Sequence, residues 1–161
     1  MSKTHYLSTL VITVITSFFI YSCGGSTQQS TSDSTATSST AGTTAETNDP
    51  KGTGKFTDVK LTHPLDQAMV SQGKAIYDVK CSACHKLTSE KLVGPGWKGV
   101  TDRRLPEWIM NFVTNTDVML SKDTAAQAMV ERCMVRMPNQ HLSDDDARHI
   151  LEYMRNNDGK N

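Results

Sequence analysis

The chain has 161 residues, with 17 basic and 17 acidic side chains and no formal net charge at neutral pH. From Leu65 onward it carries 13 charges of each sign, so it lacks the basic excess expected of a nucleic-acid-binding protein. The first 60 residues are mostly polar, which leaves about 100 residues for a core, enough for one ordinary domain. We therefore expect a single domain with no nucleic-acid partner.

The first residues have the pattern of an export signal, with Lys3 ahead of an apolar stretch at residues 7–20. That stretch contains threonine and serine and is shorter than the roughly 20 residues of a membrane-spanning helix. Residues 20–23 (Ile-Tyr-Ser-Cys) resemble the lipobox of bacterial lipoproteins, in which residues 1–22 would be removed as a signal peptide and Cys23 would carry the lipid. Alternatively, Cys23 is an ordinary residue beside an uncleaved signal anchor. Both interpretations place the rest of the chain outside the cytoplasm.

The segment from residue 24 to residue 48 consists almost entirely of serine, threonine, glycine, alanine and glutamine. It has hardly any large apolar residue whose burial could offset the entropy lost on ordering. We therefore predict a lipid-anchored disordered tether over residues 23–62 and a folded domain over residues 63–161.

Beyond residue 62, apolar residues recur at intervals of three and four, which predicts helices. The first predicted helix ends at Lys80, Pro106 suits the first turn of the second, and Ser143 with Asp146 forms a capping-box pair before the last. No segment alternates as a strand would, so the predicted fold is all-α with about four helices. Their apolar stripes are Met69, Gly73, Ile76 and Tyr77; Trp108, Ile109, Phe112 and Val113; Ala126, Met129, Val130 and Cys133; and Ala147, Ile150, Leu151 and Met154.

A Cys-x-x-Cys-His motif, formed by Cys81, Cys84 and His85, follows the first predicted helix. This is the attachment pattern for c-type haem, in which both thiols form thioethers and the histidine binds the iron. A structural disulfide or half of a zinc site would also use two cysteines. However, no second cysteine pair follows downstream, and a disulfide would leave the adjoining histidine without a role. The motif therefore predicts one covalent haem c.

Haem iron bound by the histidine of this motif has one further axial position. Met137 is the leading candidate because it precedes Pro138 in a loop, where the backbone is free of helix geometry. Met134 and Met119 are the rival methionines. His141 is a rival of another kind, because a second histidine would lower the reduction potential relative to methionine.

A helix that runs into Cys-x-x-Cys-His, then Gly94-Pro95, then Met137-Pro138 before a Leu-Ser-Asp helix start resembles the class I mono-haem cytochrome c family. The resemblance extends from about residue 66 to residue 157. It implies a class I cytochrome c fold wrapped around one covalent haem.

The resemblance also implies roles for individual residues. Cys81 and Cys84 would hold the haem covalently, and His85 and Met137 would be the two axial ligands of the iron. The Pro95 carbonyl would accept a hydrogen bond from the His85 imidazole.

Further positions have weaker parallels in the family. Gly73 with Tyr77, and Tyr153 opposite them, resemble the contact between the first and last helices. Trp97 and either Arg103 or Arg104 are candidates for contact with the haem propionates, because a guanidinium suits a carboxylate.

The fourth cysteine and the lysines near the motif each permit two interpretations. Cys133 is a reactive thiol or, since it continues an apolar stripe, a buried small hydrophobe. Lys86, Lys91 and Lys98 form a positive rim that would steer an acidic redox partner, or an ordinary solvated surface.

The favoured function is one-electron transfer between extracytoplasmic redox proteins of a respiratory chain, with no catalytic residue and no small-molecule substrate. The partners would be a respiratory reductase, an oxidase or a quinol-oxidising complex, and residues 104–110 also look like those of small lipoprotein cytochromes that accompany such reductases. The alternative is a haem enzyme or gas sensor with an open distal site. A peroxidase would need a distal acid or base, and His141 and Arg136 follow no pattern of that kind.

Overall fold

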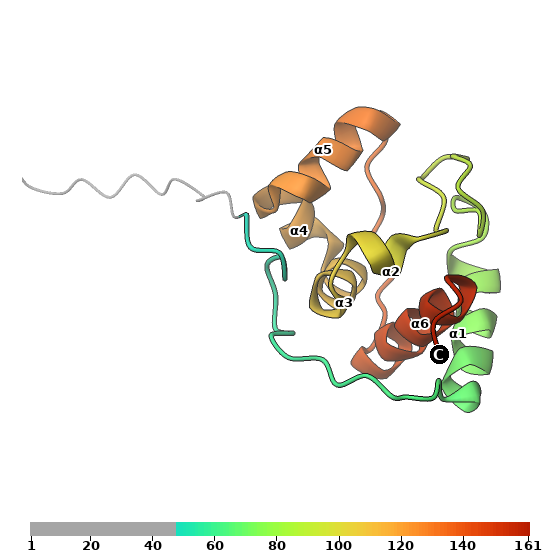
Figure 1. The fold of residues 1–161 in the computed structure, drawn as a ribbon. Coiled ribbons are helices and arrows are strands. Elements are labelled where there is room, and N and C mark those ends of the chain that lie inside the picture. Colours follow the sequence, from blue (N-terminus) through green and yellow to red (C-terminus); the bar gives the residue numbers. More distant parts are fainter. Residues whose placement is uncertain (1–47) are drawn as a thin grey trace, which may run out of the picture. The chain divides into compact units, whose positions relative to one another are not determined.

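The computed structural model describes residues 48–161 of the chain, so the predicted signal peptide, Cys23 and most of the predicted tether lie outside the described residues. Within the described range the only β-type pairing is an isolated bridge between His85 and Lys91. No helix in this range is long and apolar enough to cross a membrane. The helices are α1 (Gln67–Lys80), α2 (Val100–Arg103), α3 (Pro106–Thr114), α4 (Thr116–Lys122), α5 (Thr124–Cys133) and α6 (Asp144–Asn157), as Figure 1 shows.

The four predicted helices correspond to α1, α3, α5 and α6. Helix α1 ends at Lys80, as predicted, and Pro106 opens α3. Ser143 and Asp146 form a complete capping box at the start of α6. The short helices α2 and α4, of four and seven residues, were not predicted because neither is long enough to show a helical period.

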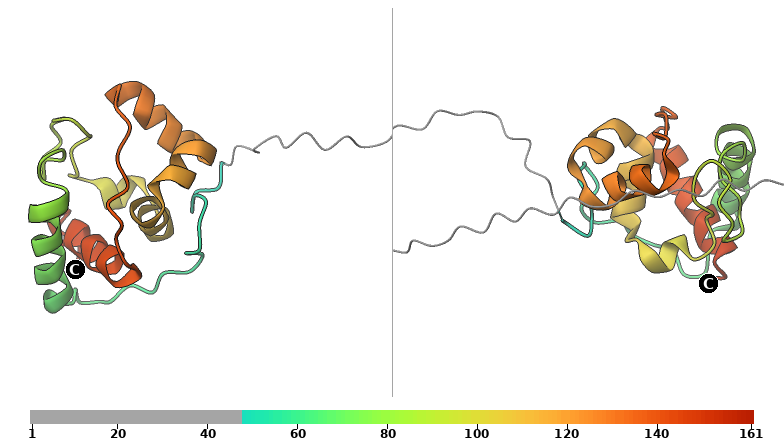
Figure 2. Two further views of the ribbon diagram at one scale, coloured as in Figure 1. Left: turned by 180° about the vertical axis from the view of Figure 1, so that it is seen from behind. Right: turned by 90° about the horizontal axis from the view of Figure 1, so that it is seen from above.

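Helices α1 and α6 pack side by side and make the most extensive helix contact in the described domain (Figures 1 and 2). A side chain at Gly73 would place its Cβ only 2.1 Å from the His149 carbonyl oxygen, so the close approach of the helices requires glycine there. The rings of Tyr77 and Tyr153 lie beside this crossing, with centroids 5.6 Å apart. The predicted contact between the first and last helices is therefore present.

Residues 48–66 form an extended segment, which we call the N-terminal strap, that runs from α5 to the start of α1. The expected boundary between tether and domain, at residue 62, differs from the structure, because residues 51–62 pack against the domain. Phe56, Val59 and Leu61 are half-buried against the core. Burial of these apolar side chains offsets the entropy of ordering the strap.

Buried polar side chains of α3 bind the backbone of the strap. The Asn111 amide donates to the carbonyl oxygens of Lys51 and Phe56 at 3.0 Å each, and its oxygen accepts from the Phe56 N–H at 2.9 Å. The Glu107 carboxylate accepts from the Val59 N–H at 3.0 Å. These contacts supply hydrogen-bond partners that a segment outside helices and sheets would otherwise lack.

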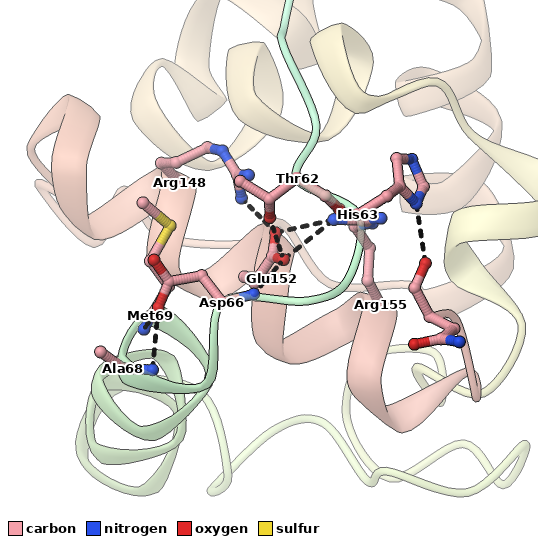
Figure 3. Close-up of polar contacts among 9 residues, drawn as sticks. Thr62, His63, Asp66, Ala68, Met69, Arg148, Glu152 and Arg155 are labelled. Atoms are coloured by element: carbon pink, nitrogen blue, oxygen red, sulfur yellow. Dashed lines mark hydrogen bonds and ion pairs between the residues drawn. The ribbon is translucent and has the colours of Figure 1, made fainter.

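The end of the strap is held by the carboxylate of Glu152 on α6, which is 0% exposed (Figure 3). Glu152 accepts hydrogen bonds from the Thr62 hydroxyl at 2.8 Å and from the Asp66 N–H at 3.2 Å. Both of its oxygens lie 2.9 Å from Arg155 Nη1, and Arg148 forms a second ion pair. Burial disfavours the charged carboxylate, but the hydrogen bonds from Arg148, Thr62 and Arg155 outweigh this and hold the pKa of Glu152 below its ordinary value.

Candidate haem site

The Cys-x-x-Cys-His motif forms a tight turn at the C-terminal end of α1. Cys81 caps the helix, and its carbonyl oxygen accepts from the N–H groups of Cys84 at 3.0 Å and His85 at 2.9 Å. The turn brings both sulfurs and the imidazole to the wall of one cavity.

The imidazole of His85 is held in place by the loop that contains Gly94 and Pro95. Its Nδ1–H donates to the Pro95 carbonyl oxygen at 2.9 Å, which leaves the lone pair on Nε2 in the neutral ring. A side chain at Gly94 would place its Cβ 2.3 Å from His85 Cε1, so the loop backbone packs directly against the ring. The Tyr77 hydroxyl donates to the His85 carbonyl oxygen at 2.6 Å. Burial lowers the pKa of His85, with the Pro95 hydrogen bond acting in the opposite direction, so the imidazole is neutral and able to bind a metal.

The two motif cysteines have the chemistry of thioether attachment rather than of a zinc site. Cys81 and Cys84 are not joined in a disulfide. Burial raises the pKa of the Cys81 thiol to about 11, so the free thiol is uncharged at neutral pH. Within residues 48–161 no three histidine, cysteine, aspartate or glutamate side chains gather as a metal site. An uncharged thioether suits a buried sulfur of this kind.

The cavity beside the motif has a volume of about 680 Å³ and an apolar interior. Six cationic side chains line it together with the apolar residues, and no aspartate or glutamate does. A flat apolar macrocycle with two carboxylates matches this combination, so the residues present fit a haem. The cations are Lys80, Lys91, Lys98, Arg103, Arg104 and Arg132, and the apolar side chains include Trp97, Val100, Trp108, Ile109, Phe112, Val113, Leu142, Ile150 and Met154.

Met137 lies on the wall of this cavity, in the loop between α5 and α6. A smaller adjoining cavity of about 60 Å³ is lined by His85 and Pro95 from one loop and by Met137 and Pro138 from the other. The structure therefore brings the two predicted axial ligands to the same two cavities.

The rival ligands weighed in the sequence lie elsewhere. The Met134 side chain is 90% exposed, and neither it nor His141 lines the cavity. Met119 is completely buried, and its sulfur accepts a hydrogen bond from the Thr53 N–H at 3.1 Å, away from the cavity wall.

Two methionines of the predicted apolar stripes, Met129 and Met154, also line the cavity. A helical apolar stripe is the same whether it faces other side chains or a cofactor, so the sequence contains no signal that separates the two cases. Cys133 is half-buried and lines both cavities beside Met129.

Arg103 and Arg104, the two candidates for contact with the haem propionates, differ in their surroundings. Arg103 is exposed and donates to the Lys98 carbonyl oxygen at 2.7 Å. Arg104 is half-buried and lies over the Trp108 ring, 4.4 Å from its centroid. Trp108 is fixed in turn by its indole N–H, which donates to Asp123 at 3.2 Å. Arg104 is thus better positioned than Arg103 to bind a haem carboxylate.

Comparison with known families supplies the assignment. The model of the family described as cytochrome c matches residues 70–158, which is more than half of the chain. The chain belongs to the cytochrome c family. No curated protein matches it. Among solved structures, cytochrome c from Rhodothermus marinus is similar, with 34% identity and a TM-score of 0.64 over 66% of this chain and 90% of that one.

Two engineered forms of the Rhodothermus marinus cytochrome c are also similar. One has 32% identity and a TM-score of 0.65, and covers 70% of this chain and 100% of its own length. The other, also 32% identical over the same shares, has a TM-score of 0.62 and is described as bound to a carbene intermediate. These likenesses support a class I mono-haem cytochrome c with an all-α fold, a covalent haem c and a role in electron transfer.

Proposed function

We propose that this cytochrome c carries single electrons through a closed haem site in which Cys81 and Cys84 hold the haem and His85 and Met137 bind its iron. When bound, the haem supplies an iron that alternates between the ferric and ferrous states. The observation that carries the proposal is the position of Met137, on the wall of both cavities that His85 lines.

The residues of the chain have three tasks in this function. Pro95 fixes the orientation of the His85 ring, because its carbonyl oxygen accepts a hydrogen bond from the Nδ1–H group. Apolar side chains of α3 and α6 exclude water from the site. Arg104, held over Trp108, offers a guanidinium to a haem carboxylate. A carrier of this kind needs no general base and no nucleophile.

The charge around the cavity favours a redox partner with an acidic face. Lys91 and Lys98 line the cavity with four further cations, whereas Lys86 is paired with Glu90 at 2.7 Å. Two of the three lysines of the predicted rim, Lys91 and Lys98, thus place a positive charge at the cavity without an acidic side chain of the described domain to neutralise it. Such a surface accelerates encounter with an acidic protein and makes the rate depend on salt.

The proposal predicts electron exchange without ligand binding. The reduced wild-type protein should not bind carbon monoxide at neutral pH, because Met137 occupies the sixth position. Ferricyanide should oxidise the same sample rapidly, and the rate should fall as ionic strength rises, since an anion is attracted to the cationic cavity mouth. Stoichiometric carbon monoxide binding, followed by absorption spectroscopy, would contradict the closed site and favour a haem enzyme or gas sensor.

We further propose that the cytochrome is anchored to a bacterial membrane through a lipid on Cys23, faces the extracytoplasmic side and serves a respiratory reductase, an oxidase or a quinol-oxidising complex. Cytochromes c of bacteria typically work outside the cytoplasm, and residues 20–23 support the anchor. Mass spectrometry of the mature wild-type protein should find Cys23 as the lipid-bearing N-terminal residue, and Cys23→Ser should abolish that modification. A mature wild-type protein that still contains residues 1–22 would contradict the lipid anchor.

A further inference from the structure

Helix α5 is the least supported of the longer helices in the described domain. Its one buried residue is Ala126, and the only helix that it contacts extensively is α4. Met129 and Cys133 on its apolar face line the cavity. The loop that carries Met137 continues directly from α5, so its position depends on how α4 and α5 are held.

The first part of the N-terminal strap, residues 48–53, lies against these two helices. The Thr124 hydroxyl at the start of α5 donates to the Asn48 side chain. The Thr53 N–H donates to the Met119 sulfur on α4 at 3.1 Å. Gly52, with a φ of +70°, packs so closely that a Cβ would lie 2.5 Å from Met119 Cε and 3.0 Å from Trp108. The strap therefore packs directly against Met119 of α4, a residue that does not line the cavity.

Helix α4 connects this contact with the wall of the smaller cavity. Met119 is completely buried, and its neighbour Leu120 lines the smaller cavity together with Met137. Asp123 joins α4 to α5 and caps α5 by accepting from the Ala126 N–H at 2.8 Å. A displacement of Met119 by the strap would thus move both helices.

We propose that residues 48–53 are a positioning element for the distal ligand: by bracing α4 and α5 through Met119, they keep the Met137 sulfur on the haem iron. The inference rests on the proposed function, in which Met137 is that ligand. It connects the N-terminal side of the domain, which leads to the proposed lipid anchor at Cys23, to the redox site.

An external ligand measures how firmly Met137 is held. Imidazole binds the ferric iron only when Met137 has left it, so its apparent affinity is its intrinsic affinity multiplied by the fraction of open molecules. Any change that weakens the brace increases that fraction and tightens imidazole binding by the same factor.

The decisive variant is Gly52→Ala in the full-length protein. The new Cβ would lie 2.5 Å from Met119 Cε, and alanine disfavours the φ of +70° at this position, so either the Met119 side chain or the strap backbone has to shift and their contact is weakened. We expect imidazole to bind about tenfold more tightly than to the wild type. The methionine-to-iron band should disappear as imidazole is added. The control is Thr62→Val, which removes the hydroxyl that donates to Glu152 at 2.8 Å, at the far end of the strap, and should leave imidazole affinity unchanged.

Met119→Leu provides a second route, because it removes the sulfur acceptor of the Thr53 N–H while roughly preserving core volume. It should tighten imidazole binding in the same direction as Gly52→Ala. Unchanged imidazole affinity in both folded variants, or an equal gain in Thr62→Val, would overturn the brace alone. Persistence of the methionine-to-iron band in Met137→Ala would overturn the brace together with the ligand assignment, so the two failures are distinguishable.

Discussion

Met137→Ala is expected to abolish the weak far-red methionine-to-iron band of the oxidised protein and to lower its reduction potential by on the order of 100 mV. The thioether sulfur favours ferrous iron, and its loss leaves the position to water or another weak ligand. The variant should also bind carbon monoxide when reduced. Absorption spectroscopy and a redox titration measure all three effects.

Two other methionines provide controls for this assignment. Met134 is 90% exposed, so Met134→Ala should keep both the band and the potential. Met129 is a sharper control, because it lines the same cavities as Met137 but is fixed within α5. If Met129→Ala removed the band and Met137→Ala did not, Met129 would be the iron ligand in place of Met137.

Glu152→Ala is expected to have the largest effect on stability, with a loss of about 3 to 5 kcal/mol of the free energy of unfolding. The substitution leaves Arg155, which is 3% exposed, without its carboxylate partner, and it removes the acceptor for Thr62 and Asp66. Denaturant unfolding followed by circular dichroism measures the change. Glu131→Ala, an exposed carboxylate on α5, should change stability by less than about 0.5 kcal/mol.

The acid dependence of unfolding gives an independent check on Glu152. Its pKa in the folded protein is held below the ordinary value of 4.5, so its contribution is complete above that value and is lost as the pH falls through the lower folded pKa. Glu152→Gln should therefore be less stable than the wild type at neutral pH and should lose less of its remaining stability below pH 4.5. Parallel pH profiles for the two proteins would show that Glu152 does not contribute in this way.

The haem motif and the helix ends were predictable because each depends on neighbours in the sequence. Cys81, Cys84 and His85 meet through a single turn, and Ser143 caps α6 through a residue three positions away. The position of Pro95 behind His85 came from the family resemblance, and the structure has the corresponding hydrogen bond. Local spacing alone contains no information about that contact across the loop.

The strap was not predictable in the same way, because its partners are distant in the sequence. Asn111 and Glu107 fall within a helix whose other residues, apart from Thr114, are apolar, and nothing in α3 itself indicates that these polar side chains face another segment rather than solvent. Phe56, Val59 and Leu61 were the available signal, but three apolar residues in a polar stretch have no helical period. Met129 and Cys133 were ambiguous for a related reason, since a cavity wall and a protein core select the same residue types.

The pairing of α1 with α6 also bears on the order in which the chain matures. These helices lie at opposite ends of the domain sequence, so their contact has high contact order and cannot form until the last helix has been synthesised. The turn that carries Cys81 and Cys84 follows α1 directly. An emerging chain therefore presents both thiols while α1 still has no native partner, and the cysteines become enclosed only after α6 has emerged. Both thiols are thus most accessible for covalent attachment before the fold closes around them.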